Sequence, residues 1–102
     1  MITHVVLLKI RRDVPQSQVD AVFAALAGLR TKIPGMLSFS GGAYTSPEGL
    51  HKGFTHGFVM TFKDEASRDA YLPHPDHEVV KAMVLKVLDG GPDGVVAFDY
   101  AC

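Results

Sequence analysis

The sequence predicts a single α+β domain of the ferredoxin-like type, with the order β-α-β-β-α-β and a four-stranded antiparallel sheet. Three observations lead to this prediction. Four segments have the β-branched and alternating character of strands, and two intervening segments repeat apolar residues at spacings of three and four. The chain has 102 residues, which is enough for one hydrophobic core. We therefore expect residues 1–102 to form one domain.

The first strand and the first helix have the clearest patterns. Residues 2–10 (ITHVVLLKI) are rich in β-branched and aliphatic side chains, as strands are. A helix of about 15 residues is expected to begin at Pro15 or Ser17 and to end near Lys32, because Pro34 cannot continue it. Apolar side chains recur along it at helical spacing: Val19, Val22, Phe23, Leu26 and Leu29.

Two further strands are expected in the middle of the chain. Residues 36–44 predict a second strand, which its two adjacent glycines weaken. A polar loop over residues 45–53 leads to a third strand over residues 54–63 (FTHGFVMTFK). Alternation places His56 and Phe58 on the same face of this strand.

A proline-rich corner at residues 70–77 (AYLPHPDH) divides the second helical segment. Pro73 and Pro75 bias the residues before them away from helical dihedral angles. Asp76 is then expected to cap a helix that begins at about His77. A tyrosine and a histidine are thereby held on either side of a rigid turn.

The remaining elements complete the predicted sheet. A short helix over residues 65–71 precedes the corner, and a longer helix over residues 77–88 follows it. The glycine-rich turn at residues 90–94 leads to the last strand, residues 95–100. Helices on one face of the sheet leave the other face uncovered. That face carries Val5, Leu7, Val59 and either Val95 with Ala97 or Val96 with Phe98. Because a second copy of the chain would cover it, we expect a homodimer packed through the sheet.

Composition excludes several functional classes. The formal net charge is −1, so no basic field favours nucleic acid or an anionic membrane. The single cysteine, Cys102, allows neither an internal disulfide nor a cysteine-based zinc finger. No apolar run approaches the roughly 20 residues that span a bilayer, and the N-terminus lacks a signal-segment pattern. We therefore expect a small, soluble, cytoplasmic protein.

Five segments in this order resemble the stress-responsive A/B barrel (Dabb) family. They are residues 4–9 (HVVLLK), 33–35 (IPG), 53–58 (GFTHGF), 71–77 (YLPHPDH) and 98–100 (FDY). The resemblance covers nearly the whole chain, and the HPxH element with its upstream tyrosine is the most specific part. It implies a ferredoxin-like chain that forms a dimeric α/β barrel, in agreement with the homodimer expected from the sheet faces.

The resemblance also implies a small-molecule site. In a plant polyketide cyclase of this family a histidine acts as base with an assisting tyrosine, and these match His77 and Tyr71. Pocket histidines of that enzyme match His4, His56 and His74. Phe23 and Phe58 are expected to line the same pocket. An aromatic residue that follows the last helix of the cyclase is absent here, so the substrate does not carry over.

The residues themselves support acid–base chemistry. Histidine is a natural general base near neutral pH, and tyrosine can donate a hydrogen bond to a developing enolate. His4 and His56 share one face of two neighbouring central strands, so we expect them to lie close together, under the helices with His77 and Tyr71. The expected reaction is of the cyclase, isomerase or lyase type on a carbonyl or polyketide-like substrate, without a cofactor.

Other interpretations remain open from the sequence. The histidines also fit structural roles: a capping or exposed His77, hydrogen-bonded core residues at His4 and His56, and a His74 that holds the corner. A non-catalytic, stress-responsive ligand-binding or structural dimer is the main alternative function. A metal site is less favoured, because the histidines come from separate elements with no short ligand spacing. A monooxygenase on the same barrel ranks last, since the chain has no tryptophan.

Overall fold

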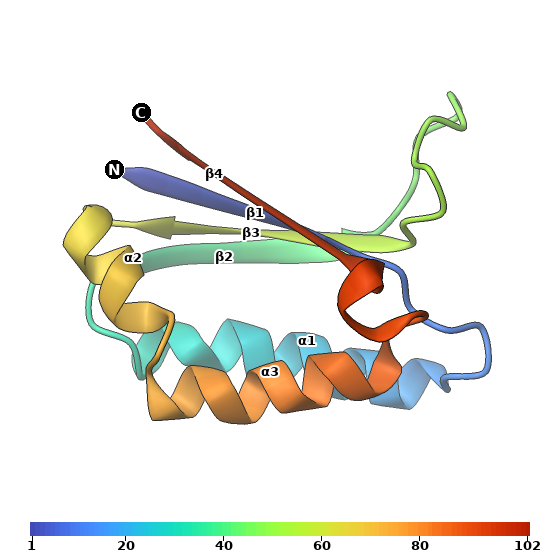
Figure 1. The fold of residues 1–102 in the computed structure, drawn as a ribbon, viewed down its shortest axis with the longest axis horizontal. Helices are drawn as coiled ribbons and strands as arrows, with labels where there is room; N and C mark the ends of the chain where they lie inside the picture. The colour runs from blue at the N-terminus through green and yellow to red at the C-terminus, as the bar shows by residue number, and fades with distance from the viewer.

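The computed structural model describes all residues, 1–102, as a sheet lying on a layer of helices (Figure 1). The strands are β1 (Ile2–Leu8), β2 (Met36–Ala43), β3 (His56–Phe62) and β4 (Val95–Ala101). Their order in the sheet is β2-β3-β1-β4, and every neighbouring pair is antiparallel. The predicted ferredoxin-like α+β fold is confirmed.

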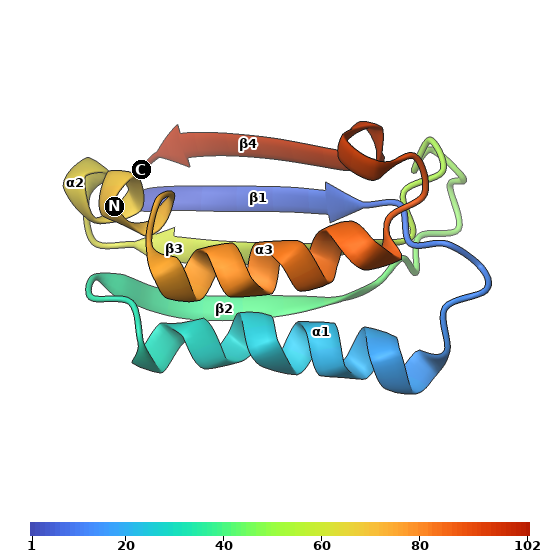
Figure 2. The same cartoon turned by 60° about the horizontal axis from the view of Figure 1, so that its bottom comes forward.

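The two long helices, α1 (Gln16–Gly28) and α3 (Pro75–Val87), lie side by side on one face of the sheet (Figures 1 and 2). The short helix α2 (Glu65–Tyr71) lies at one end of the sheet. Two 3₁₀ turns, η1 (Leu29–Thr31) and η2 (Gly91–Gly94), follow the long helices. None of the helices combines the length and the apolar character that crossing a membrane requires.

The hydrophobic core lies between the helices and the facing side of the sheet. It contains 17 buried residues. Leu8 of β1, Met60 and Phe62 of β3 and Val87 of α3 are fully buried. Alternation along β1 sends His4 to this inner side together with Leu8, as the sequence predicts.

The edge strand β4 has no helix over it. Figure 2 shows α3 in front of β3 and α1 displaced toward β2, while β4 lies clear of both helices. Ala97 pairs with Val6 and therefore faces the helix side, yet its side chain is exposed. Phe98 pairs with Val5 on the opposite, outer side. The outer face therefore carries Val96 and Phe98, which resolves the alternative left open by the sequence.

The proline corner differs from its prediction in two details. His74, not Asp76, caps α3: its Nδ1 accepts a hydrogen bond from the Asp76 amide at 3.1 Å. Proline favours the first helical position, so Pro75 makes the preceding residue the cap. Leu72 keeps helical dihedrals (φ −56°, ψ −46°) despite the proline after it, because its amide bonds back to the Arg68 carbonyl.

Several predicted boundaries shift by a few residues. β1 ends at Leu8, and Ile10 forms an isolated bridge with Leu88 instead of continuing the strand. The first helix ends at Gly28, and one 3₁₀ turn carries the chain on to Thr31. These changes leave the order of elements unaltered.

Candidate active site

A cleft opens between α3 and the part of the sheet formed by β1 and β4. Its volume is about 260 Å³, slightly below the roughly 300–1,000 Å³ of pockets for drug-sized ligands. The polar side chains that line it include His4, Tyr71 and His77, and most of the remaining lining is apolar. Residues of α3 line one side of the cleft, and residues of β1 and β4 line the other. The cleft suits one small, largely apolar molecule.

Helix α3 contributes one face to this cleft. Lys81 follows His77 by four residues, and Val84 and Leu85 follow Lys81 by three and four, the spacings that place side chains on the same side of a helix. Leu88, just after the helix, completes this wall. One end of the cleft is consequently polar and the other apolar.

Tyr71 occupies the polar end. Its side chain is 1% exposed, and its ring centroid lies 4.1 Å from that of His77 and 6.0 Å from that of His4. The Tyr71 hydroxyl has no protein hydrogen-bond partner. Every fully buried polar side-chain atom in the structure has such a partner, so the Tyr71 hydroxyl is not fully buried. The hydroxyl is therefore open to the cleft. Burial, and then the charge of Asp99, raises the pKa of Tyr71, so its proton stays in place.

His77 lies in the first turn of α3, where its ring meets that of Tyr71. The Leu72 carbonyl oxygen lies 2.9 Å from its Nδ1. A carbonyl can only accept, so Nδ1 carries the hydrogen and Nε2 holds the free lone pair of the neutral ring. Burial lowers the pKa of His77, and this effect exceeds the opposing one of the Leu72 hydrogen bond. At neutral pH the residue is a neutral base.

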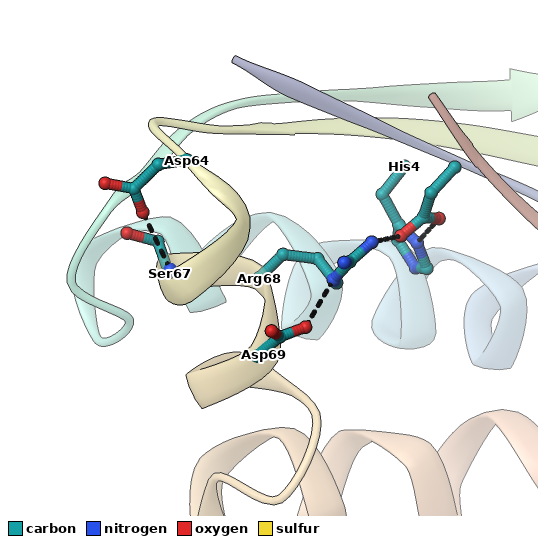
Figure 3. Close-up of polar contacts among 6 residues, drawn as sticks. His4, Asp64, Ser67, Arg68 and Asp69 are labelled. Carbon is teal, nitrogen blue, oxygen red and sulfur yellow. Dashed lines mark hydrogen bonds and ion pairs between the residues drawn. The ribbon is translucent and has the colours of Figure 1, made fainter. Parts of the chain in front are cut away.

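His4 is oriented by a carboxylate on the neighbouring strand. Its Nδ1 lies 2.5 Å from Oδ1 of Asp99, and Nη1 of Arg68 donates to Asp99 Oδ2 at 2.7 Å. Figure 3 shows Arg68 reaching from α2 toward His4. Burial alone would raise the pKa of Asp99, but the hydrogen bonds from Arg68 and His4 outweigh it and lower the pKa. The ionised Asp99 thus holds the Nδ1–H tautomer of His4.

The contacts of Asp99 and Arg68 at His4 were not predicted from the sequence. Alternation places Asp99 on the face of β4 that carries Val95 and Ala97, but the sequence left open which face meets the helices; in the structure it is this one. An acidic residue on such a face requires a partner. Arg68 gave no comparable signal, since it lies on a short helix whose position depends on the tertiary fold.

The other expected site residues divide between the cleft and other places. Phe58 lines the cleft. The expectation that His4 and His56 lie close together is wrong, because His4 pairs with Met60 and His56 pairs with Leu8, four residues farther along β1. His56 instead packs against Phe23 at 5.7 Å between ring centroids, and neither residue lines the cleft. His74 caps α3.

The comparison with protein families agrees with this geometry. The family model described as the stress responsive A/B barrel domain, or Dabb, matches residues 2–102. The chain belongs to the stress-responsive A/B barrel family. The family's fold is thus present over essentially the whole chain.

Two curated relatives of this Dabb domain carry descriptive names. One is the stress-response A/B barrel domain-containing protein HS1 of Arabidopsis thaliana, 30% identical over 97% of this chain and 87% of the relative. Olivetolic acid cyclase of Cannabis sativa is 25% identical over 74% of this chain and 75% of the cyclase. One of the two relatives is therefore named as an enzyme.

Solved structures also match the Dabb domain closely. A dimeric ferredoxin-like protein from Jannaschia has a TM-score of 0.89 and 29% identity, over 99% of this chain and 98% of that one. A hydroxynitrile lyase from Passiflora edulis has a TM-score of 0.86 at 22% identity, over 97% and 90% of the two chains. The second likeness shows the fold alone.

A second hollow of the Dabb domain lies on the outer face of the sheet. The loop between β2 and β3 rises there, away from the helices (Figure 1). The hollow measures about 480 Å³ and is lined by Leu7, Tyr44, Leu50 and Phe54, among others. It contains none of the residues at the polar end of the cleft. Separately, no three His, Cys, Asp or Glu side chains lie close enough together to hold a metal ion.

Proposed function

We propose that this Dabb domain binds a small carbonyl compound in the cleft and transfers a proton within it, with His77 as base and Tyr71 as hydrogen-bond donor. One observation carries the proposal. The Tyr71 hydroxyl has no protein partner and lies beside a histidine whose Nε2 is left free by the Leu72 hydrogen bond. A hydroxyl that is open to the cleft and bonds to no protein group is available to a ligand, since most buried polar side-chain atoms have a hydrogen-bond partner.

The chemistry follows from the two protonation states. His77 takes a proton from the carbon next to the carbonyl, and the electron pair of that C–H bond moves toward the oxygen to form an enolate. Tyr71 donates a hydrogen bond to the enolate oxygen. His4, oriented by Asp99, contributes a second Nε2 that can exchange the proton with His77 or with the product. No organic cofactor takes part in these steps.

The relative named olivetolic acid cyclase favours a reaction of the cyclase, isomerase or lyase type. The apolar end of the cleft supports a substrate with an aliphatic or aromatic portion beyond its carbonyl. Since 11 of the 14 lining residues are hydrophobic, ligand binding without turnover is the second candidate function.

We also infer that the domain is a homodimer. The outer face of the sheet exposes apolar side chains, and 64% of Phe98 is accessible to solvent. Apolar patches of this kind mark interfaces. The Jannaschia protein of the same fold is described as dimeric, which supports the same arrangement here.

Proton transfer can be tested without knowledge of the natural substrate. Small ketones and oxo acids are incubated with the protein in deuterium oxide, and deuterium uptake next to the carbonyl is followed by NMR. We expect uptake with the wild type, a loss of about 10²–10⁴-fold in His77→Asn, and a smaller loss in Tyr71→Phe. His51→Asn, in the loop beyond β2, is the matched control. Ligand-induced shifts with no uptake would favour the binding function.

A further inference from the structure

One lysine, Lys81, lines the cleft, and the proposed proton transfer does not use it. Lys81 follows His77 by four residues on α3, so their Cβ atoms lie about 5–6 Å apart on the same face of the helix. No Asp or Glu lines the cleft, and Lys81 forms no ion pair. Arg11 and Arg68, in contrast, are paired with carboxylates.

We propose that Lys81 binds a carboxylate of the substrate, so that the natural substrate of this cleft is an oxo acid. This inference rests on the proposed function and specifies its substrate class. Lys81 is exposed to solvent where it lines the cleft, and a carboxylate bound there would form a charge-assisted hydrogen bond with its ammonium group. The carboxylate would be held about one helical turn from the base.

A carboxylate fits this surrounding better than a phosphate group does. Lys81 is the single lysine of the lining, and no arginine lines the cleft. Phosphate carries more charge and is commonly held by several donors or by an arginine fork. The remaining lining on this side, including Val84, Leu85 and Ala97, is apolar and offers no further partner for the extra charge of a phosphate.

The charge of Lys81 also acts on the base. After burial, it is among the influences that lower the pKa of His77. A substrate carboxylate on Lys81 would offset that charge once bound. The same contact would thereby anchor the substrate and increase the basicity of His77 in the complex, when the proton must be taken.

The test compares 4-oxooctanoate with its methyl ester, which keeps the carbonyl and removes the charge. Dissociation constants come from NMR titration of the full chain. The wild type should bind the acid roughly tenfold more tightly than the ester. Lys81→Met should remove this preference, and Lys81→Arg should keep it. Lys86→Met, the same change on an outward position of α3, should have no effect.

Two results would overturn the inference: equal binding of acid and ester by the wild type, or an equal loss for both ligands in Lys81→Met. Deuterium uptake by the same two compounds separates this inference from the proposed function. If deuterium uptake is equal for the acid and the ester and is unchanged in Lys81→Met, proton transfer is retained and the carboxylate site is excluded. Binding of the acid through Lys81 without uptake retains the site and removes the catalytic role.

Discussion

His4 on β1 and Asp99 on β4 are direct partners across two antiparallel strands, and their side chains meet at 2.5 Å on the helix side of the sheet. The register of the two strands therefore brings the Asp99 carboxylate to the His4 imidazole, and no loop residue is needed to position either group. Arg68 holds the other carboxylate oxygen from α2. The strands, more than the loops, determine the orientation of His4 in the cleft.

The first prediction concerns Asp99. In Asp99→Asn the amide can donate to the Nδ1 of His4, so the ring loses the fixed Nδ1–H tautomer and Arg68 loses an ionised partner. We expect slower proton transfer, with a smaller loss than in His77→Asn, and weaker ligand binding. Deuterium uptake and ¹⁵N shifts of the His4 ring measure the two effects. Glu65→Gln, on an exposed acid at the start of α2, is the control. An unchanged His4 tautomer in Asp99→Asn would contradict the proposed positioning.

The second prediction is the pH dependence of activity. His77 must be neutral to accept a proton, and burial lowers its pKa from the ordinary value of about 6.5. Activity should therefore be full at neutral pH and fall only below pH 6.5, as His77 takes up a proton. Because the pKa of Tyr71 is raised, no loss from its ionisation is expected near its ordinary value of about 10. If the rate already decreases while the pH is lowered from 8 to about 7, His77 is excluded as the base.

The third prediction concerns stability at acidic pH. Burial lowers the pKa values of both His77 and His56, so at pH values below about 6.5 the unfolded chain binds more protons than the folded one. The free energy of unfolding should consequently decrease as the pH falls from about 6.5 through the lower folded-state pKa values. Urea unfolding at several pH values measures this slope. Replacing both histidines with glutamine should flatten it, and an unaltered slope would show that other groups cause the loss.

The fourth prediction tests the outer face. Phe98→Glu places a charge on the surface that is proposed to join two copies, so the dimer should dissociate at micromolar concentration. Sedimentation equilibrium measures the mass. Val79→Glu, an equally exposed apolar position on α3, should leave the mass unchanged. A wild type that sediments as a monomer would contradict the dimer directly.

The fifth prediction concerns the turn that leads into β2. Gly35 has φ +83°, and a Cβ atom there would clash with the Ser67 side chain. Gly35→Ala should therefore destabilise the protein by more than about 1 kcal/mol, measured by urea unfolding. Gly28→Ala, where nothing lies within 4 Å of the new atom, should leave stability equal or slightly higher. Equal stability of both variants would show that the turn can rearrange freely.

Much of the architecture was accessible from the sequence because it depends on local patterns. Alternation along residues 2–10 placed His4 on the helix side, and the prolines at 73 and 75 placed the turn between α2 and α3. Tyr71 and His77 are only six residues apart on that turn, so their meeting needed no long-range information. The N-cap of α3 was predicted wrongly because His74 and Asp76, two residues apart, both have side chains that can accept a hydrogen bond from a backbone amide.

The sequence by itself determined the order of strands and helices, the apolar faces and the Tyr71–His77 pair, since dihedral preference and periodicity act over a few residues. Only the tertiary structure decided which side of β4 faces inward, and with it the contact between Asp99 and His4. It also decided that His56 lies away from the cleft, because strand register depends on the packing of the whole sheet. The cleft itself forms only in the tertiary structure, because its lining comes from α3, β1 and β4, which are far apart in the sequence.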